Sequence, residues 1–292
     1  KLSADAIMEN VQFDDCIIGM EFAAREESGR RVMGIVHSKS LATTIATDEI
    51  SFLWPIPETW SMEEAATVPV VYATVYYALL VRGGLVAGES VLIHSGTGGV
   101  GQAAINVCLS MGCKVYTTVG NDEKRAFLQE LFPQLTDDCF ASSRSAEFEQ
   151  HILSVTKGRG VDVVLNSLAE EKLRASVRCL ARNGRFLEIG KFDFTQNNPL
   201  GMGAFLKNIS FSGIFLDNFL YPDKCNSPLE MTHKRQISEL MAHGIESGVV
   251  KPLKRTIFTM DQCEDAFRFM ASGKHIGKVL IKIRDEEPQN VT

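Results

Sequence analysis

The sequence predicts an α/β protein built on a doubly wound parallel sheet, with a smaller β-rich domain formed by the two ends of the chain. Three observations predict it: β-rich runs alternate with helical patterns between residues 70 and 216, one run enters a glycine-rich turn, and the flanks lack this alternation. The 292 residues, 45% of them hydrophobic, suffice for two domains. We expect a sheet domain over residues 70–216, and residues 1–69 and 217–292 to form a discontinuous second domain.

The central block contains five predicted strands and four predicted helices, in strict alternation. The strands are expected at residues 91–94, 114–119, 161–166, 185–189 and 209–213. The helices are expected at residues 100–111, 124–131, 146–156 and 170–180, and Gly112, Gly158 and Gly184 follow three of them as C-terminal breakers. This order is typical of βαβ units, whose strands are parallel.

The flanks hold shorter elements. Strands are expected at residues 32–37 and 42–46, in a region punctuated by Gly, Ser and Pro. After residue 217 we expect a helix at 233–247, a strand at 256–258, a helix at 260–271 and a final strand at 278–283.

Composition excludes several classes of function. A net charge of −6 provides no broad cationic surface, so neither nucleic acid nor an anionic membrane is expected as a partner. The apolar stretch at residues 65–80 is shorter than the roughly 20 residues that span a bilayer, and the N-terminus shows no signal-peptide pattern. Seven widely spaced cysteines indicate free thiols, and hence a reducing, cytoplasmic location.

The most informative motif is the segment from Val91 to Ala104, in which an apolar strand, a glycine turn and a helix follow one another directly. Gly96 would make the tight turn, Gly98 or Gly99 would let the backbone approach a pyrophosphate, and Gly101 would allow close packing of helix on strand. Thr97 and Val100 complete the loop. In this context the pattern predicts a Rossmann-type dinucleotide site with the phosphates at the helix N-terminus.

The end of the second strand favours NADPH over NADH. In NAD-dependent enzymes an acidic residue about 20 positions after the first glycine binds the ribose hydroxyls, but residues 116–120 contain none. Lys124 and Arg125 follow within a turn and could bind a 2′-phosphate, with small Thr118 leaving room and Arg144 reaching the adenine end.

An alternative stays open for this region. Lys124 and Arg125 could be solvated residues at a helix start, and Asp122 or Glu123 could bind the ribose instead.

Several segments together resemble the enoyl reductase domain of animal fatty acid synthase and related reducing polyketide synthases, in the medium-chain dehydrogenase/reductase superfamily. They are residues 69–79, the glycine loop, residues 187–191, 205–208 and 264–267, and residues 273–279, and the resemblance extends over essentially the whole chain. It implies a GroES-like second domain, partly truncated at the N-terminus. It also implies reduction of the trans-2 double bond of an enoyl thioester on an acyl carrier protein, among other domains of a parent synthase.

Enoyl reduction needs a hydride at the β-carbon and a proton at the α-carbon. Lys191 directly follows an apolar strand and so lies where ligands bind in open α/β folds. The resemblance also points to Lys191, together with Asp217, as proton donors. The alternatives are that Lys191 holds a phosphate or only solvates a strand end, and that Asp217 caps a helix.

The resemblance further implies cofactor contacts at Tyr72 and Thr74 beneath the nicotinamide and at Lys278, which could meet a phosphate or ribose. Contacts are also expected at Ser167 and Gly190. Core packing is the alternative for Tyr72 and Thr74. No Cys and His set with ligand spacing occurs, so no metal is expected.

Two other functions fit the same motifs. A free-standing quinone or alkenal reductase would share the loop and cofactor, and a non-catalytic NADPH-binding domain would keep the fold without the reaction. A homodimer through the parent enzyme is an expectation by analogy alone.

Overall fold

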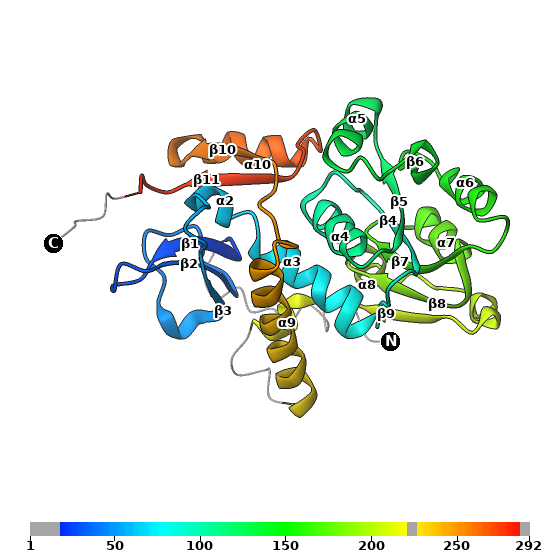
Figure 1. Cartoon of the computed structure of the whole chain (residues 1–292), viewed down its shortest axis with the longest axis horizontal. Helices are drawn as coiled ribbons and strands as arrows, with labels where there is room; N and C mark the ends of the chain where they lie inside the picture. The colour runs from blue at the N-terminus through cyan, green and yellow to red at the C-terminus, as the bar shows by residue number, and fades with distance from the viewer. Residues whose placement is uncertain (1–17, 221–226, 287–292) are drawn as a thin grey trace. The chain divides into compact units, whose positions relative to one another are not determined.

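The computed structural model of the chain describes residues 18–220 and 227–286, which form two compact units (Figure 1). Within the described part, the first unit comprises Ala78–Thr97 and Ala104–Phe215, and the second comprises residues 18–77, Gly98–Ala103 and the residues from Leu216 onward. Each unit is described by itself below. The domain limits predicted at residues 69 and 216 stay predictions.

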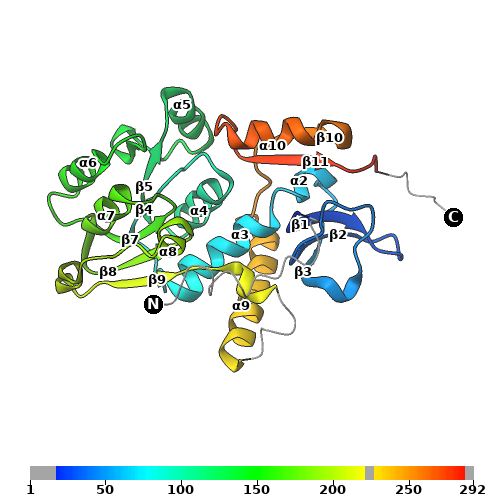
Figure 2. The same ribbon diagram turned by 180° about the vertical axis from the view of Figure 1, so that it is seen from behind.

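The first unit is built on a six-stranded sheet in which every neighbouring pair of strands is parallel. The strand order is β6-β5-β4-β7-β8-β9, so β6 and β9 are the edge strands (Figures 1 and 2). The strands are β4 (Ser90–Ile93), β5 (Lys114–Val119), β6 (Phe140–Ser142), β7 (Val161–Asn166), β8 (Leu180–Glu188) and β9 (Ser210–Gly213). This is the doubly wound fold that the alternation of elements predicts, and the prediction is confirmed.

Helices connect these strands. The α-helices are α4 (Gly99–Ser110), α5 (Asp122–Leu131), α6 (Phe148–Val155), α7 (Glu171–Arg178) and α8 (Phe192–Thr195). The shorter turns are η3 (Asp137–Cys139) and η4 (Met202–Lys207). One face of the sheet is covered by α6 and α7, because Phe148 and Leu173 share a hydrophobic core with Leu92, Val164 and Phe186 of the strands.

The second unit contains two small sheets. Strands β1 (Glu21–Arg25), β2 (Arg31–Val36) and β3 (Ile50–Pro55) form an antiparallel sheet, and β10 (Arg255–Thr259) pairs in parallel with β11 (Lys278–Lys282). The helices are η1 (Thr47–Glu49), α2 (Met62–Ala65), α3 (Pro69–Val75), η5 (Leu216–Phe219), α9 (Pro228–Glu246), η6 (Met260–Gln262) and α10 (Cys263–Ala271). The π-helix η2 (Tyr76–Arg82) continues α3 into the first unit.

Most predicted elements are found within a few residues of their expected limits. All five predicted strands of the central block form, but β8 begins at Leu180, five residues before the predicted start. The strand expected at residues 42–46 is wrong, because these residues form bends and irregular chain. The three-residue edge strand β6 was not predicted, since so short a run has no readable period.

The segment Met62–Arg82 is long and apolar enough to cross a membrane by composition, but 67% of its apolar window is buried inside the protein. Burial of this kind is typical of a core helix.

Candidate functional site

In the first unit, four parallel strands bring their carboxyl ends to one edge of the sheet. The residues just beyond these ends include Ser95 after β4, Gly120 after β5, Ser167 after β7 and Gly190 after β8. The strand order reverses at β4, which has β5 on one side and β7 on the other. In open α/β sheets ligands bind at this switch point, outside the carboxyl ends of the strands.

The turn after β4 leaves no room for a Cβ at position 96 unless neighbouring side chains shift. A Cβ there would lie 2.2 Å from Thr117 Oγ1 and 3.0 Å from Leu128 Cδ1, which is inside van der Waals contact. The Gly96 N–H donates to the Thr118 carbonyl at 3.0 Å, so the loop is fastened against β5. This tightness is what a loop that must cradle a pyrophosphate requires, and the first glycine therefore fits a dinucleotide.

In the second unit, Gly98 to Gly101 lead into the first turn of α4. A Cβ on Gly99 would lie 2.9 Å from Val71 Cγ1 and 3.1 Å from Lys278 Cδ, and Gly98 forms a bridge with Gly277. The C-terminal loop and the glycine loop, far apart in sequence, thus meet, and the contact of Lys278 with a cofactor stays a prediction. The Lys278 ammonium itself is paired with Glu21, whose other oxygen accepts the Val70 N–H at 2.9 Å.

Tyr72 and Thr74 lie on α3. The Tyr72 side chain is fully buried, and its hydroxyl accepts from the Lys251 N–H and donates to the Lys251 carbonyl, both at 3.1 Å. This is the geometry of a core tyrosine that ties α3 to the chain after α9. Thr74 is half-buried. Their contact with the nicotinamide stays a prediction.

Beyond β5, the basic residues differ in how they are held. Arg125 forms an ion pair with Asp137 at 2.7 Å and covers the Phe140 ring at 5.3 Å. The exposed Arg144 lies across the strand end, donating from Nε to the Gly120 carbonyl at 2.9 Å. Arg144 thus lies against the end of β5, and its contact with the adenine end of a cofactor stays a prediction. Lys124 is half-buried, with its N–H capped by Asn121 at 2.9 Å.

A buried carboxyl joins the ends of β7 and β8. Glu188 is 2% exposed; one oxygen accepts the Gly190 N–H at 2.6 Å and the other accepts from Asn166 Nδ2. Burial raises the pKa of Glu188 to about 7, helped by the nearby Asp193 carboxylate and opposed by the two N–H donors. Asn166 also donates to the Leu168 carbonyl at 2.6 Å, so both its N–H groups are used. We call these hydrogen bonds of Glu188 with Asn166 and Gly190 the Glu188 clamp. It fixes the backbone beside the predicted contacts Ser167 and Gly190.

Lys191 follows this clamp and is exposed at the start of α8. Its ammonium lies 5.5 Å from the centroid of the Phe215 ring, within range of a cation–π interaction that favours a defined position for the charge. Asp217 is half-buried on η5 in the second unit. Their shared role in proton donation stays a prediction.

Three polar residues near these strand ends escaped sequence-based prediction. His94 directly follows β4, Asn166 ends β7 and Glu188 ends β8, and all three are buried. The signal that could have found them is a polar residue at the end of an otherwise apolar strand, since a buried polar group needs a specific partner.

Among residues 18–220 and 227–286, no group of three or more His, Cys, Asp or Glu side chains could hold a metal ion. The donors in this part of the chain therefore do not fit a structural or catalytic zinc, which takes at least three such ligands.

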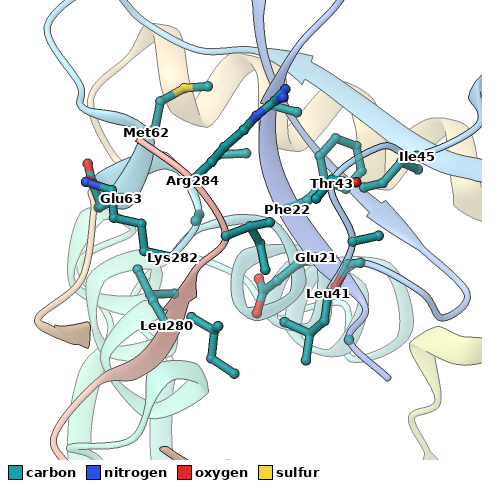
Figure 3. Close-up of a pocket in the computed structure, with 18 of the residues that line it drawn as sticks. Glu21, Phe22, Leu41, Thr43, Ile45, Met62, Glu63, Leu280, Lys282 and Arg284 are labelled. Atoms are coloured by element: carbon teal, nitrogen blue, oxygen red, sulfur yellow. The ribbon is translucent and has the colours of Figure 1, made fainter. Parts of the chain in front are cut away.

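The second unit contains a cavity of about 940 Å³, lined mainly by apolar side chains such as Phe22, Ile45 and Leu280 (Figure 3). Glu63 and Lys282 form an ion pair of 3.4 Å in its wall. None of the predicted site residues lines it. We therefore do not assign the chemistry to this cavity, despite its size.

Comparison with known proteins agrees with the geometry. The sequence profile described as zinc-binding dehydrogenase matches residues 136–281. The highly reducing polyketide synthase frbB of Dothideomycetidae sp. is 43% identical over 239 residues, covering 81% of this chain and 9% of that protein. The lovastatin diketide synthase lovF of Aspergillus terreus is 40% identical over 261 residues, covering 89% of this chain and 10% of that protein. The chain thus spans about a tenth of the length of these relatives.

Solved structures that resemble this chain include enoyl reductases as well. The crystal structure of CurK enoyl reductase superimposes with a TM-score of 0.80 at 29% identity, over 96% of this chain and 84% of that one. The nucleotide-binding subdomain of the enoylreductase domain of PpsC from Mycobacterium tuberculosis is 40% identical, with a TM-score of 0.55, over 63% of this chain and 97% of that one.

Proposed function

This chain belongs to the zinc-binding dehydrogenase family, as an enoyl reductase domain of the type found in reducing polyketide synthases, and we propose that it reduces the trans-2 double bond of an enoyl thioester with NADPH. These comparisons confirm the expected resemblance to enoyl reductase domains and the expected fold of the medium-chain dehydrogenase/reductase superfamily. The thioester on an acyl carrier protein, the other domains of a parent synthase and a cytoplasmic location belong to the proposal.

The observation that carries the dinucleotide is the glycine loop at the switch point of the sheet, where Gly96 leaves no room for a Cβ. The nicotinamide cofactor, when bound, supplies the hydride. The loop backbone would hold the pyrophosphate, and the N-terminus of α4 would stabilise its charge.

The preference for NADPH rests on the end of β5. No carboxylate follows Val119 before the helix cap Asn121, and Arg144 lies over Gly120 with its guanidinium exposed. A guanidinium binds a phosphate through paired N–H groups, so it favours a 2′-phosphate over a free hydroxyl. Asp122 and Glu123 lie in the first turn of α5 and remain the alternative ribose ligands.

In the proposed reaction, Lys191 donates the proton to the α-carbon. Its position after β8 at the carboxyl edge of the sheet, with the ammonium held over Phe215, suits a charge that must meet a developing enolate. Asp217 is the second candidate donor.

The test is oxidation of NADPH and of NADH by the chain with crotonyl pantetheine thioester, comparing wild type with Lys191→Ala and Asp217→Ala. We expect faster turnover with NADPH, and about 100-fold slower turnover in a variant that lacks the proton donor. Lys114→Ala is the matched control, because Lys114 is also exposed and lies 5.6 Å from an aromatic centroid, but at the amino end of β5.

Normal turnover in both variants would remove the assigned donors while keeping the reductase. Tight NADPH binding with no turnover of the thioester in wild type would favour a non-catalytic domain, and turnover of quinones or alkenals alone would favour the free-standing type of reductase.

A further inference from the structure

Behind the glycine loop lies a buried chain of hydrogen bonds that neither the proposed reaction nor the loop motif requires. It is centred on His94, which is 4% exposed and packs edge-on against the Phe148 ring at a centroid distance of 4.9 Å. The imidazole Nδ1 lies 3.0 Å from Thr118 Oγ1, and Nε2 lies 2.7 Å from Ser176 Oγ. Thr118 and Ser176 are themselves fully buried.

The donor and the acceptor of every hydrogen bond in this buried network can be assigned. Ser176 uses its one hydroxyl hydrogen on the Lys172 carbonyl at 2.6 Å, so it must accept from His94 Nε2–H. The neutral imidazole then accepts at Nδ1 from the Thr118 hydroxyl. That leaves Thr118 Oγ1 as the acceptor for the Ser95 backbone N–H, at 3.2 Å.

The charge state of His94 agrees with this assignment. Burial lowers the pKa of His94 to about 3, and the positive charge of Lys172 lowers it further. A protonated ring would carry a hydrogen on Nδ1 and would force the Thr118 hydroxyl to turn away from it. The neutral ring therefore keeps the Thr118 lone pairs available to Ser95.

Ser95 is the last residue of this hydrogen-bond network and the first residue of the glycine loop. Its φ is +57°, in the left-handed region that residues other than glycine seldom adopt. Thr118 holds the loop twice, accepting the Ser95 N–H at its hydroxyl and the Gly96 N–H at its carbonyl. A backbone conformation of this kind persists only where surrounding contacts determine it.

We propose that His94 is a positioning residue for the phosphate loop: as the Nε2–H tautomer it orients the Thr118 hydroxyl, which holds Ser95 in its left-handed conformation and so presets the loop for a dinucleotide. This inference rests on the proposed dinucleotide binding. It assigns Ser176 of α7 a part in cofactor affinity, which no sequence motif indicates.

The first test measures the dissociation constant for NADPH by its fluorescence, without turnover. Thr118→Val, which keeps the side-chain shape and removes the hydroxyl, should weaken binding about tenfold, and Ser176→Ala about threefold. Thr118→Ser should restore binding to within about twofold of wild type. The kcat at saturating NADPH should change less than the KM for NADPH in Ser176→Ala.

The matched control is Thr156→Val. The Thr156 hydroxyl also accepts an N–H, from Gly160 at 3.0 Å, and donates to the Ile152 carbonyl at 2.6 Å, but it lies at the end of α6. It should leave NADPH affinity unchanged whatever it does to stability. Equal affinities for Thr118→Val and Thr156→Val would overturn the proposal.

The second test is ¹⁵N NMR of histidine-labelled protein. His94 should show the neutral Nε2–H tautomer with constant shifts from about pH 5.5 to about pH 8.5. Titration of His94 in this range, or the Nδ1–H tautomer, would also overturn the positioning role. If wild type binds NADPH and the variants bind it equally well, the proposed function survives without this inference; if wild type binds no dinucleotide, both are wrong.

Discussion

Replacing Glu188 with glutamine should change how the stability of this protein depends on pH. The side chain is 2% exposed, and its carboxyl accepts from the Gly190 N–H and from Asn166 Nδ2. A glutamine keeps the volume but presents an NH₂ group to one of these donors. The Asn166 amide would have to turn to accept from it, losing its bond to the Leu168 carbonyl.

The magnitude follows from the pKa of Glu188, which burial raises from 4.5 to about 7. The folded state then holds this proton more tightly than the unfolded state. Its contribution to stability is fully present below about pH 4.5 and is lost as the pH rises through about 7. The pKa difference of about 2.5 corresponds to about 3 kcal/mol in total, of which about 2.5 kcal/mol falls between about pH 5 and about pH 8.

The assay is urea unfolding of wild type and Glu188→Gln at about pH 5, 6, 7 and 8, since glutamine does not titrate. Other groups contribute equally to both proteins, so the difference between their unfolding free energies isolates Glu188. We expect wild type to lose about 2.5 kcal/mol relative to the variant across this range. Glu130→Gln, an exposed carboxylate on α5, is the control and should follow wild type. Parallel profiles for wild type and Glu188→Gln would refute the reasoning.

Four further substitutions test three glycine positions and the proposed role of Arg144 in binding the adenosine 2′-phosphate. Gly277→Ala should destabilise the fold by about 2 kcal/mol or more, because φ is +75° and the new Cβ would lie 1.9 Å from the Lys254 carbonyl. The control is Gly273→Ala, which is also at positive φ but has nothing within 4 Å of the new Cβ, and it should cost only about 1 kcal/mol. Equal losses of stability in thermal unfolding would contradict the predicted clash of residue 277 with the Lys254 carbonyl. Gly96→Ala should abolish NADPH binding measured by fluorescence while the sheet still folds; unchanged affinity would show that the turn tolerates a side chain. Arg144→Ala should weaken NADPH at least about tenfold and NADH far less, and equal losses would assign Arg144 to adenine rather than to the 2′-phosphate.

Five of the six strands of the sheet could be predicted because each carries its own local signal, which the three-residue strand β6 lacks. The run Val161–Asn166 is apolar and β-branched, it forms β7 at the predicted residues, and Gly158 ends the pattern before it. The strand expected at residues 42–46 was wrong because a local signal alone does not make a strand. Among residues 18–220 and 227–286 no strand pairs with this apolar alternation, and pairing is a property of two segments rather than one.

Some features of the candidate site could likewise be predicted from the sequence, and others could not. The glycine loop could be predicted because its glycines lie directly between an apolar strand and a helix. The structure adds that Thr117 and Leu128 leave no space for a Cβ on Gly96. The pairing of Lys278 with Glu21 could not be predicted, since the two residues are 257 positions apart. The ion pair of Arg125 with Asp137 likewise depends on how the chain returns after α5.

What the sequence determined by itself was the doubly wound sheet, the glycine loop and its place after the first central strand, since these follow from periodicity and from the backbone freedom of glycine. The family resemblance supplied the expected reaction. Only the tertiary structure decided which polar side chains are buried together: His94 with Thr118 and Ser176, and Glu188 with Asn166. These contacts join strands and helices far apart in the chain, and both pKa values are shifted chiefly by burial, which no local pattern of residues encodes.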